Sequence, residues 1–460
     1  MTVRWLMAAT LVAAAAVPAA GQAREAVTDA FRGSVPQGTA SAEPLALSFK
    51  ETLDRGLQFN LGLLLQEETQ RAAHGARWTA LADLLPNLKG SVSERRQVIN
   101  LEAFGFPAPD PIVGPFNVFD ARIGLSQRLI DLAALNEARA ASLDEKVQLS
   151  GIRSARELVV LVTVNLYLEA ISASSRIDVA RAQLETANVL QRQASNLKTS
   201  GLVAGIDVLR AEAQVQRQRQ RLIVAENDFE KAKLRLGRSI GLPPGQRILL
   251  TDTIPFAPLD AIPLEQAIQN AYVHRADYLA AADRVAAAEA RAKAASAERL
   301  PSLSLDADYG TIGQTVSNAH PTYTVAATLR VPIFEGGRVK GRTIEADAEL
   351  RQQRAVYDDL RARIDTEVRS AFLDVNAAAQ QVDTAQTTVG LATQELAQAR
   401  DRFAAGVSDT IEVTRAQESL ARASEDRIDA LYQHNVAKAV LARAVGIAEE
   451  AVLAFASGVK

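Results

Sequence analysis

Apolar residues recur through the second half of the chain at alternating steps of four and three positions. This heptad series comprises Ala371, Val375, Ala378, Val382, Ala385, Val389, Ala392, Leu396, Ala399 and Phe403. Such spacing is typical of a helix that packs along one seam against another helix. One constant displacement toward the N-terminus reaches a second copy of the series: Leu166, Ala170, Ala173, Ile177, Ala180, Leu184 and Ala187.

The same displacement matches Gly201 with Gly406 and Gly241 with Gly446, so we predict two copies of one long-helix unit. The long helices are expected at about 132–197 and 338–404, each roughly 100 Å long at 1.5 Å per residue. A glycine turn and a return helix follow each, which completes helix pairs at about 132–238 and 338–445. A shorter opening helix is expected before each unit's strands, at about 47–85 and 264–300, and proline ends both.

Two regions between these helices change to a period of two, which predicts antiparallel hairpins at about 87–130 and 302–333. In the clearest strands one face is apolar (Phe119, Ala121, Ile123 and Leu125; Leu303, Leu305, Ala307 and Tyr309). The other face contains five charged residues: Asp120, Arg122, Asp306, Asp308 and Arg330. Each clean strand has the ~9–11 residues that a tilted strand needs to cross a bilayer. The alternative is a small soluble sheet with one wet face.

Four strands cannot close a barrel, and open sheet edges are not tolerated in lipid. If the hairpins are in a membrane, several chains must therefore combine them into one barrel, with the charged face lining its lumen. The fold class is thus mainly α with a small antiparallel β part. It combines a two-repeat coiled-coil α-barrel with four strands per chain.

The N-terminus has the pattern of an export signal, in which Arg4 precedes an apolar run and small residues. We therefore predict a signal peptide at 1–22, a flexible segment at 23–44, repeat 1 at 45–254 and repeat 2 at 255–454. The net charge of −3 argues against nucleic acid as a partner. The absence of cysteine excludes disulfides, zinc–thiolate sites and thiol catalysis.

No constellation of catalytic residues emerges. The four histidines (His74, His274, His320 and His434) lie far apart without a second histidine at ligand spacing, and no phosphate-binding glycine loop is present. We therefore expect no enzymatic activity, no cofactor and no metal site, and energy for any transport must come from a partner.

Three short motifs resemble those of the outer-membrane efflux protein (TolC) family: Arg299–Leu303 (RLPSL), Val331–Gly337 (VPIFEGG) and Gly201–Ala204 (GLVA). The resemblance extends from about Leu45 to Val452. It implies a homotrimer with a twelve-stranded transmembrane β-barrel in outer-membrane lipid and an α-helical tunnel across the periplasm of a Gram-negative bacterium.

The resemblance also implies partners, a periplasmic adaptor (membrane fusion) protein and an inner-membrane pump, in tripartite efflux or type I secretion. Two features depart from the family pattern. Arg275-Ala276-Asp277-Tyr278 replaces the usual Arg-Pro-Asp-Leu, and the lipidated cysteine of many drug-efflux members is missing.

The helical turns are the main candidate sites. The resemblance implies adaptor contact there, and the residues concerned are Gly201, Leu202, Val203, Gly406 and Val407, where apolar residues flank glycines that suit a helix C-cap. The alternative is that these are two helical turns without a binding role. Asp207 and Glu412 occupy equivalent positions in the two repeats and, with Arg210 and Arg415, are candidates for a periplasmic gate. The alternative is that these acids stabilise helix N-termini, Glu412 in a capping box with Asp409. They could also pair with Arg210 and Arg415, three residues on.

The sequence therefore predicts an outer-membrane channel-tunnel that conducts substrates passively. The alternative function is a soluble periplasmic coiled-coil adaptor or scaffold, whose hairpins would form a small sheet outside any membrane. The sequence does not specify the substrate, the class of pump or the resting state of the gate.

Overall fold

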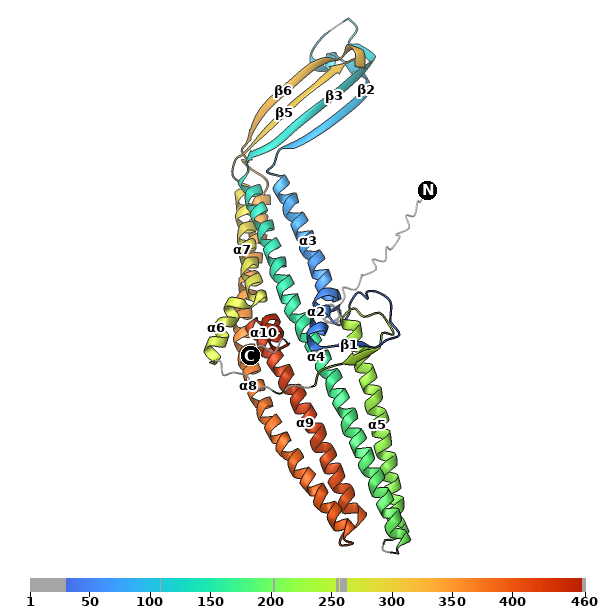
Figure 1. Cartoon of the computed structure of the whole chain (residues 1–460). Coiled ribbons are helices and arrows are strands. Elements are labelled where there is room, and N and C mark those ends of the chain that lie inside the picture. The colour runs from blue at the N-terminus through green and yellow to red at the C-terminus, as the bar shows by residue number, and fades with distance from the viewer. Residues whose placement is uncertain (1–29, 108, 202, 254–255, 257–262, 457–460) are drawn as a thin grey trace, which may run out of the picture.

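The computed structural model describes residues 30–107, 109–201, 203–253, 256 and 263–456. The predicted signal peptide 1–22, part of the segment 23–44 and the tip residue Leu202 lie outside this range. The fold class is confirmed: the chain is mainly helical, with one four-stranded antiparallel sheet at the end of a long helical body (Figure 1).

Four helices pack side by side in the order α3 (Leu61–Ala82), α4 (Leu132–Thr199), α7 (Ala276–Ala297) and α8 (Arg338–Ala404). Helices α4 and α8 contain 68 and 67 residues and run from the sheet to the opposite end of the molecule. Helix α5 (Gly205–Ser239) returns along α4, and α9 (Thr410–Val445) returns along α8. Nine of the ten seam residues predicted in α8 are buried, and Val389 is half-buried.

The two opening helices are each broken, which corrects the prediction of continuous helices at 47–85 and 264–300. The first consists of α2 (Phe49–Phe59) and α3, separated by Asn60 in an extended conformation. The Asn60 side chain accepts hydrogen bonds from the backbone of Gly62 and Leu63, so it caps a new helix instead of continuing the old one. The second consists of α6 (Leu264–His274) and α7, separated by Arg275.

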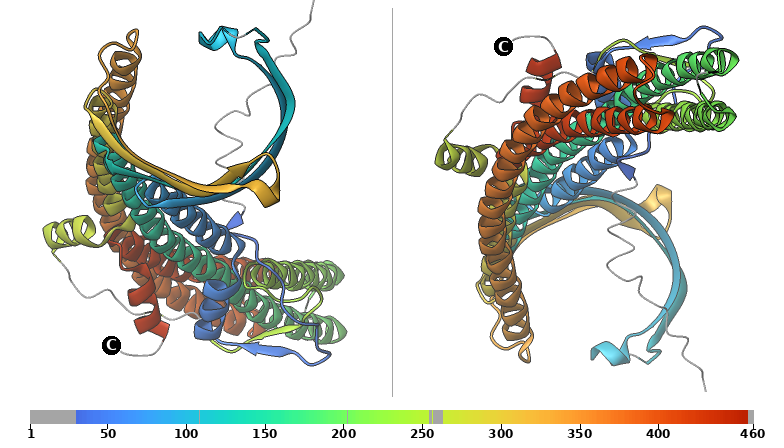
Figure 2. Two further views of the ribbon diagram at one scale, coloured as in Figure 1. Left: turned by 90° about the horizontal axis from the view of Figure 1, so that it is seen from above. Right: turned by 90° about the horizontal axis from the view of Figure 1, so that it is seen from below.

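The sheet has the strand order β2 (Asn87–Asn100), β3 (Ile112–Ile130), β5 (Ser302–Gly313) and β6 (His320–Arg330). All its pairs are antiparallel, and β2 and β6 are its edges. A register shift between Gln97 and Ile99 accounts for the irregular pattern of the first strand. The sheet and the helical layer are concave toward the same side (Figure 2).

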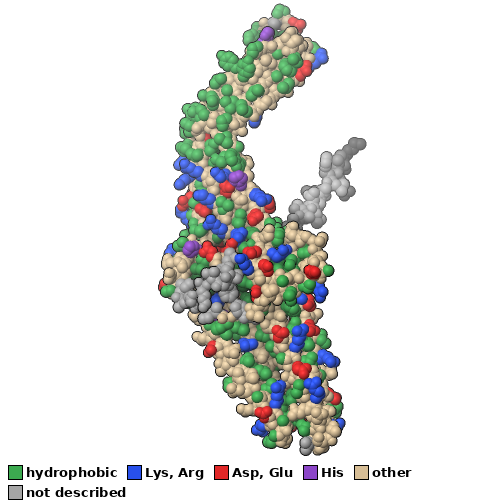
Figure 3. Space-filling model, in the orientation of Figure 1, with side chains coloured by type: hydrophobic (Ala, Val, Ile, Leu, Met, Phe, Trp, Pro, Cys, Tyr) green, Lys and Arg blue, Asp and Glu red, His purple; other side chains and the backbone are tan. Residues whose placement is uncertain are grey.

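Large apolar side chains cover one face of the sheet and are 62–78% exposed: Leu88, Val92, Ile123, Tyr309, Tyr323, Val325 and Leu329. On the face drawn in Figure 3, hydrophobic side chains dominate the sheet, whereas charged side chains gather over the helices. A soluble protein rarely leaves so wide an apolar surface uncovered. The sheet is therefore amphipathic in the sense that a membrane barrel requires.

The core of the helical body surrounds the apolar middle of α4. One 18-residue window there has a mean hydropathy of 1.6, enough by length and composition for a membrane helix, but 56% of it is buried within the protein. Val160, Val164 and Leu168 pack against Leu53 of α2 and Ala439 of α9. A short parallel pair that we did not predict, β1 (Leu45–Leu47) with β4 (Ile248–Leu250), packs beside this core. The apolar stretch of α4 is therefore a core helix.

A charge cluster lies where α6, α7, α8 and α9 meet. Arg275 is 7% exposed, donates two hydrogen bonds to Asp277 (3.0 and 2.7 Å) and lies 2.6 Å from the carboxylate of Glu367. It also donates to the carbonyl of Ala444 (3.4 Å) in the last turn of α9. Arg275 thus fixes the break between α6 and α7 and caps α9.

Glu157 of α4 faces the same cluster and forms no ion pair with any residue that the structure describes. Burial raises its pKa to about 7, and Arg443 and Arg275 only partly offset this through their charge. The nearby carboxylates of Asp277 and Glu449 raise the pKa further.

Glycine is required at the end of α9, where Gly446 has a φ of +83°. A Cβ added there would lie 2.7 Å from the backbone nitrogen of Arg275. The left-handed backbone costs a non-glycine residue roughly 1–2 kcal/mol, and the clash adds roughly 1–3 kcal/mol. Gly406 has nearly the same φ, +73°, but open space around it.

We therefore expect Gly446→Ala to destabilise the protein more than Gly406→Ala, by roughly 1–3 kcal/mol, because only Gly446 adds the clash. Thermal melting followed by far-UV circular dichroism measures the difference. Equal melting temperatures for the two variants would contradict the close packing of α9 on Arg275.

A second prediction concerns pH. The raised pKa of Glu157 means that the folded state favours its protonated form, so the contribution of this group to stability should be full below about pH 4.5 and be lost as the pH rises through about 7. Glu157→Gln should remove this loss and leave the variant more stable than the parent at pH 8. Melting temperatures of both proteins between pH 5 and 8 test this. A constant difference across the range would contradict it.

Candidate functional site

Two helical turns lie together at the end of the molecule remote from the sheet (Figure 1). We call this region the tip; it comprises the turns 200–204 and 405–409 with the adjoining turns of α4, α5, α8 and α9. Apolar residues from all four helices form its core: Ala194, Val208, Ala211, Leu396, Ala399, Phe403, Val413 and Ala416. The tip is therefore one packed unit.

Glycine ends the descending helix in both turns. Gly201 and Gly406 have φ values of +74° and +73°. The N–H of Gly406 donates to the carbonyl of Phe403, and that of Val407 to the carbonyl of Arg402, which is the Schellman pattern. Among the predicted contact residues, Gly201 and Gly406 are exposed, Val203 is half-buried and Val407 is 69% exposed.

Asp207 links the two turns. Its Oδ1 accepts hydrogen bonds from Thr410 Oγ1 at 3.0 Å and from Arg210 at 3.3 Å. Thr410 is the first residue of α9, and its side chain reaches α5. We did not single out Thr410, although a signal existed: threonine stands there where the first repeat has Gly205.

Glu412 has different neighbours, despite its equivalent position in the repeat. Asp409 caps α9 by accepting hydrogen bonds from Ile411 and Glu412, and the Glu412 carboxylate lies 3.1 Å from Arg402 Nε of α8. The suggested pairing with Arg415 is wrong, since Arg415 is exposed and forms no ion pair with any described residue. The cause is the close return of α9 along α8, which brings Arg402 within reach first.

Three buried glutamines line the helices above this contact. Gln214 and Gln218 of α5 and Gln417 of α9 are at most 5% exposed. Gln214 Nε2, Gln218 Oε1 and Gln417 Oε1 have no hydrogen-bond partner within the described part of the chain. A buried polar atom without a partner costs roughly 1–3 kcal/mol. Gln214 and Gln417 line one small cavity between the two helical hairpins, so the packing there is weaker than an apolar seam would be.

The charged residues of the sheet form a second candidate site. Arg122 of β3 forms two 2.8 Å hydrogen bonds to Asp120 and a third, also 2.8 Å, to Asp308 of β5. Asp306 accepts from Ser304 at 3.4 Å, and Arg330 lies opposite Ser302 at the base of β6. Three of the five predicted lumen residues are thus brought together on the polar face, where the guanidinium balances two carboxylates.

No cluster that could bind a metal ion occurs in the described ranges of the chain.

Comparisons with known proteins agree with this geometry. A family model described as "Outer membrane efflux protein" matches residues 54–242 and 267–447. The pyoverdine export outer membrane protein OpmQ of Pseudomonas aeruginosa is 26% identical over 389 residues, which cover 82% of this chain and 80% of OpmQ. Outer membrane protein TolC of Vibrio cholerae is 23% identical over 93% of this chain and 97% of its own length.

Solved structures show the same fold. The outer membrane protein VceC of Vibrio cholerae matches with a TM-score of 0.76 at 18% identity, covering 86% of this chain and 96% of VceC. The CmeC outer membrane channel of Campylobacter jejuni matches with a TM-score of 0.78 at 18% identity, covering 90% of both chains.

Proposed function

The chain belongs to the outer membrane efflux protein family, and we propose how its sheet, its helical body and its tip divide the work of an outer-membrane channel. It is a channel-tunnel of the Gram-negative outer membrane that extends into the periplasm. Members of the family form trimers and act with an adaptor and an inner-membrane pump. The alternative of a soluble adaptor or scaffold is not supported.

Three copies of this chain would form the membrane barrel. The observation that supports this most directly is the sheet itself, with two unpaired edges, one apolar face and one charged face. In lipid every backbone N–H and C=O must be paired, so β2 of one copy must bond to β6 of the next until the barrel closes. Three copies give twelve strands, with the apolar face toward lipid and Arg122 toward the lumen.

The helical layer has free edges at the same two sides, since α3 and α8 are its outermost members. Rotation of three copies about the barrel axis would bring α8 of one copy beside α3 of the next and close a tube. A closed tube of this kind suits passive conduction. The energy would come from the pump.

The tip would be the periplasmic entrance. Three copies place three Asp207–Thr410 contacts and three Glu412 carboxylates around the axis, where acids favour cations when ionised. The Asp207–Thr410 hydrogen bond joins the α4–α5 and α8–α9 helical hairpins of one copy, so its loss should let these helical hairpins separate. Gly201, Val203, Gly406 and Val407 would then contact the adaptor at the outer end of the tip.

The relatives differ in their cargo. OpmQ is named for pyoverdine export, and AprF of Pseudomonas aeruginosa is named for secretion of alkaline protease. We propose no specific substrate for this chain, because a shared duct leaves the choice of substrate to the pump and the adaptor.

The assembly is tested by extracting the protein from purified outer membranes in mild detergent and measuring its mass by light scattering. We expect a stable trimer, because only closure satisfies the edges of β2 and β6. Recovery of a monomer from the soluble periplasmic fraction would overturn both the trimer and the membrane assignment.

The gate is tested by single-channel conductance of Thr410→Val in planar bilayers. Removing one hydrogen bond of about 1 kcal/mol from each of three copies should favour opening by about 3 kcal/mol, or roughly a hundredfold. Conductance should therefore rise.

Thr414→Val is the matched control, since Thr414 Oγ1 bonds only to the Thr410 carbonyl within α9. Equal conductance of the two variants, both trimeric, would show that the contact does not hold the entrance closed.

A further inference from the structure

The segment between β6 and α8 exposes two large apolar side chains for which the sheet and the helices provide no cover. Ile333 is 95% exposed and Phe334 is 86% exposed, the highest values among the large hydrophobic residues that the structure describes. They lie in the segment 331–337, at the level where the sheet meets the helical body. Two such side chains side by side indicate a surface that is buried in the assembled protein.

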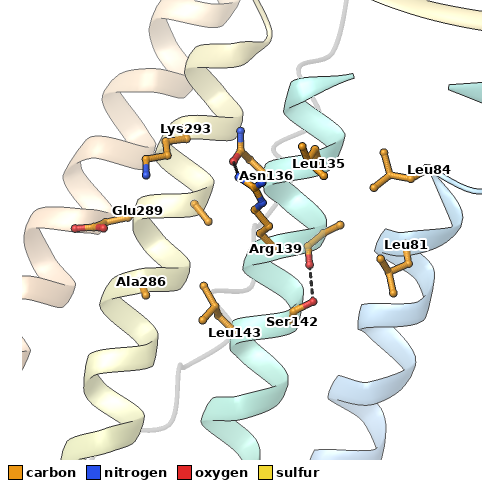
Figure 4. A pocket seen from close by; sticks show the side chains of 12 residues that line it. Leu81, Leu84, Leu135, Asn136, Arg139, Ser142, Leu143, Ala286, Glu289 and Lys293 are labelled. Atoms are coloured by element: carbon orange, nitrogen blue, oxygen red, sulfur yellow. Dashed lines mark hydrogen bonds between the residues drawn. The ribbon is translucent and has the colours of Figure 1, made fainter. Parts of the chain in front are cut away.

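A groove lies at the same level across α3, α4 and α7. It has a volume of about 510 Å³. Its apolar lining includes Leu81 of α3, Leu84 in the turn after α3 and Leu135 of α4, and its charged lining comprises Arg139 of α4 with Glu289 and Lys293 of α7. Figure 4 shows Leu81 of α3 and Leu84, in the turn after α3, pointing toward α4 beside Leu135, with Glu289 and Lys293 across the pocket on α7. Leu84 stands just before β2, and Leu135 lies in the first turns of α4 after β3, so the groove is immediately below the sheet.

Symmetry brings the segment and this groove together. Rotation about the barrel axis leaves every residue at its own height. Where β6 of one copy meets β2 of the next in antiparallel pairing, the chain that leaves the base of β6 comes beside the chain that enters the base of β2. The segment 331–337 therefore lies against the neighbour's Leu84 and Leu85, and Leu85 is itself 48% exposed.

We propose that Ile333 and Phe334 of one copy pack into the groove of the next copy, beside Leu84, and lock the trimer at the junction of barrel and tunnel. This inference rests on the proposed trimer. A second copy fits better than membrane lipid because the segment is continuous with the two free edges, β6 and α8, that the trimer covers. Burial of a phenylalanine and an isoleucine at each of three sites would stabilise the trimer at the junction of the barrel and the helical tunnel.

Disulfide formation tests the contact directly, because the natural chain contains no cysteine. The double variant Phe334→Cys with Leu84→Cys is oxidised in the intact trimer and run on a non-reducing denaturing gel. A disulfide requires Cβ atoms about 3.5–4.5 Å apart. We expect a covalent trimer that reverts to monomers on reduction.

Phe334→Cys with Leu65→Cys is the matched control. Leu65 is 52% exposed on α3 and precedes Leu84 by nineteen residues, which places it about 28 Å away along the helix axis. It should give monomers only. Crosslinking of the Leu65 pair to the same extent as the Leu84 pair would overturn the inference, since it would reflect random collisions.

The experiment distinguishes an error in the proposed packing of Phe334 from an error in the proposed trimer. A trimer in mild detergent whose Phe334–Leu84 pair stays reduced would overturn the packing and leave the channel intact. Absence of any trimer in the parent protein would overturn the proposed assembly itself.

A second measurement uses Phe334→Trp in trimers reconstituted with brominated lipid. A tryptophan packed in the neighbour's groove should be quenched no more than the parent protein. Strong additional quenching would assign the side chain to lipid and overturn the proposal.

Discussion

The structure depends on the rule that a β-strand in lipid must satisfy its backbone hydrogen bonds within protein. This chain supplies four strands and leaves β2 and β6 unpaired, so one copy cannot be stable in a membrane by itself. The helical layer ends at the same two sides as the sheet, because its outermost helices, α3 and α8, are joined to the edge strands β2 and β6. Assembly is thus a condition of folding for the sheet, and the tunnel follows from closing the barrel.

The two repeats have become different where they meet. Asp207 and Glu412 occupy equivalent positions in the two repeats. Asp207 nevertheless forms a hydrogen bond to the other helical hairpin, whereas Glu412 forms an ion pair within its own helical hairpin. Thr410 in place of a second glycine creates the cross-contact, and unsatisfied glutamines weaken the seam behind it. Close packing of alanine and valine makes each helical hairpin stiff, while the contact between the two helical hairpins is polar. A structure built this way can move its hairpins as units.

Periodicity was sufficient to predict the long helices, their seams and the sidedness of the strands, because burial of apolar area dominates those features. The breaks at Asn60 and Arg275 were missed, since both depend on side chains that bond to backbone or to charges brought close only by tertiary packing. The same limit applies to the tip. Sequence spacing suggested an ion pair between Glu412 and Arg415. In the structure α9 packs close to α8, and Glu412 pairs with Arg402 instead. The Arg122 network likewise needed the strand register, which joins β3 to β5 across a long stretch of chain.

The continuity of α4 has a mechanical consequence. This helix runs unbroken past the charge cluster around Arg275 and Glu157 to the tip, while its neighbours α3 and α7 end beside it. From Glu157 to the end of α4 is roughly 60 Å at 1.5 Å per residue. If this part of α4 tilts by about one degree at Glu157, its far end moves by roughly 1 Å over that length. Small changes of packing at the middle of the molecule are therefore magnified at its entrance.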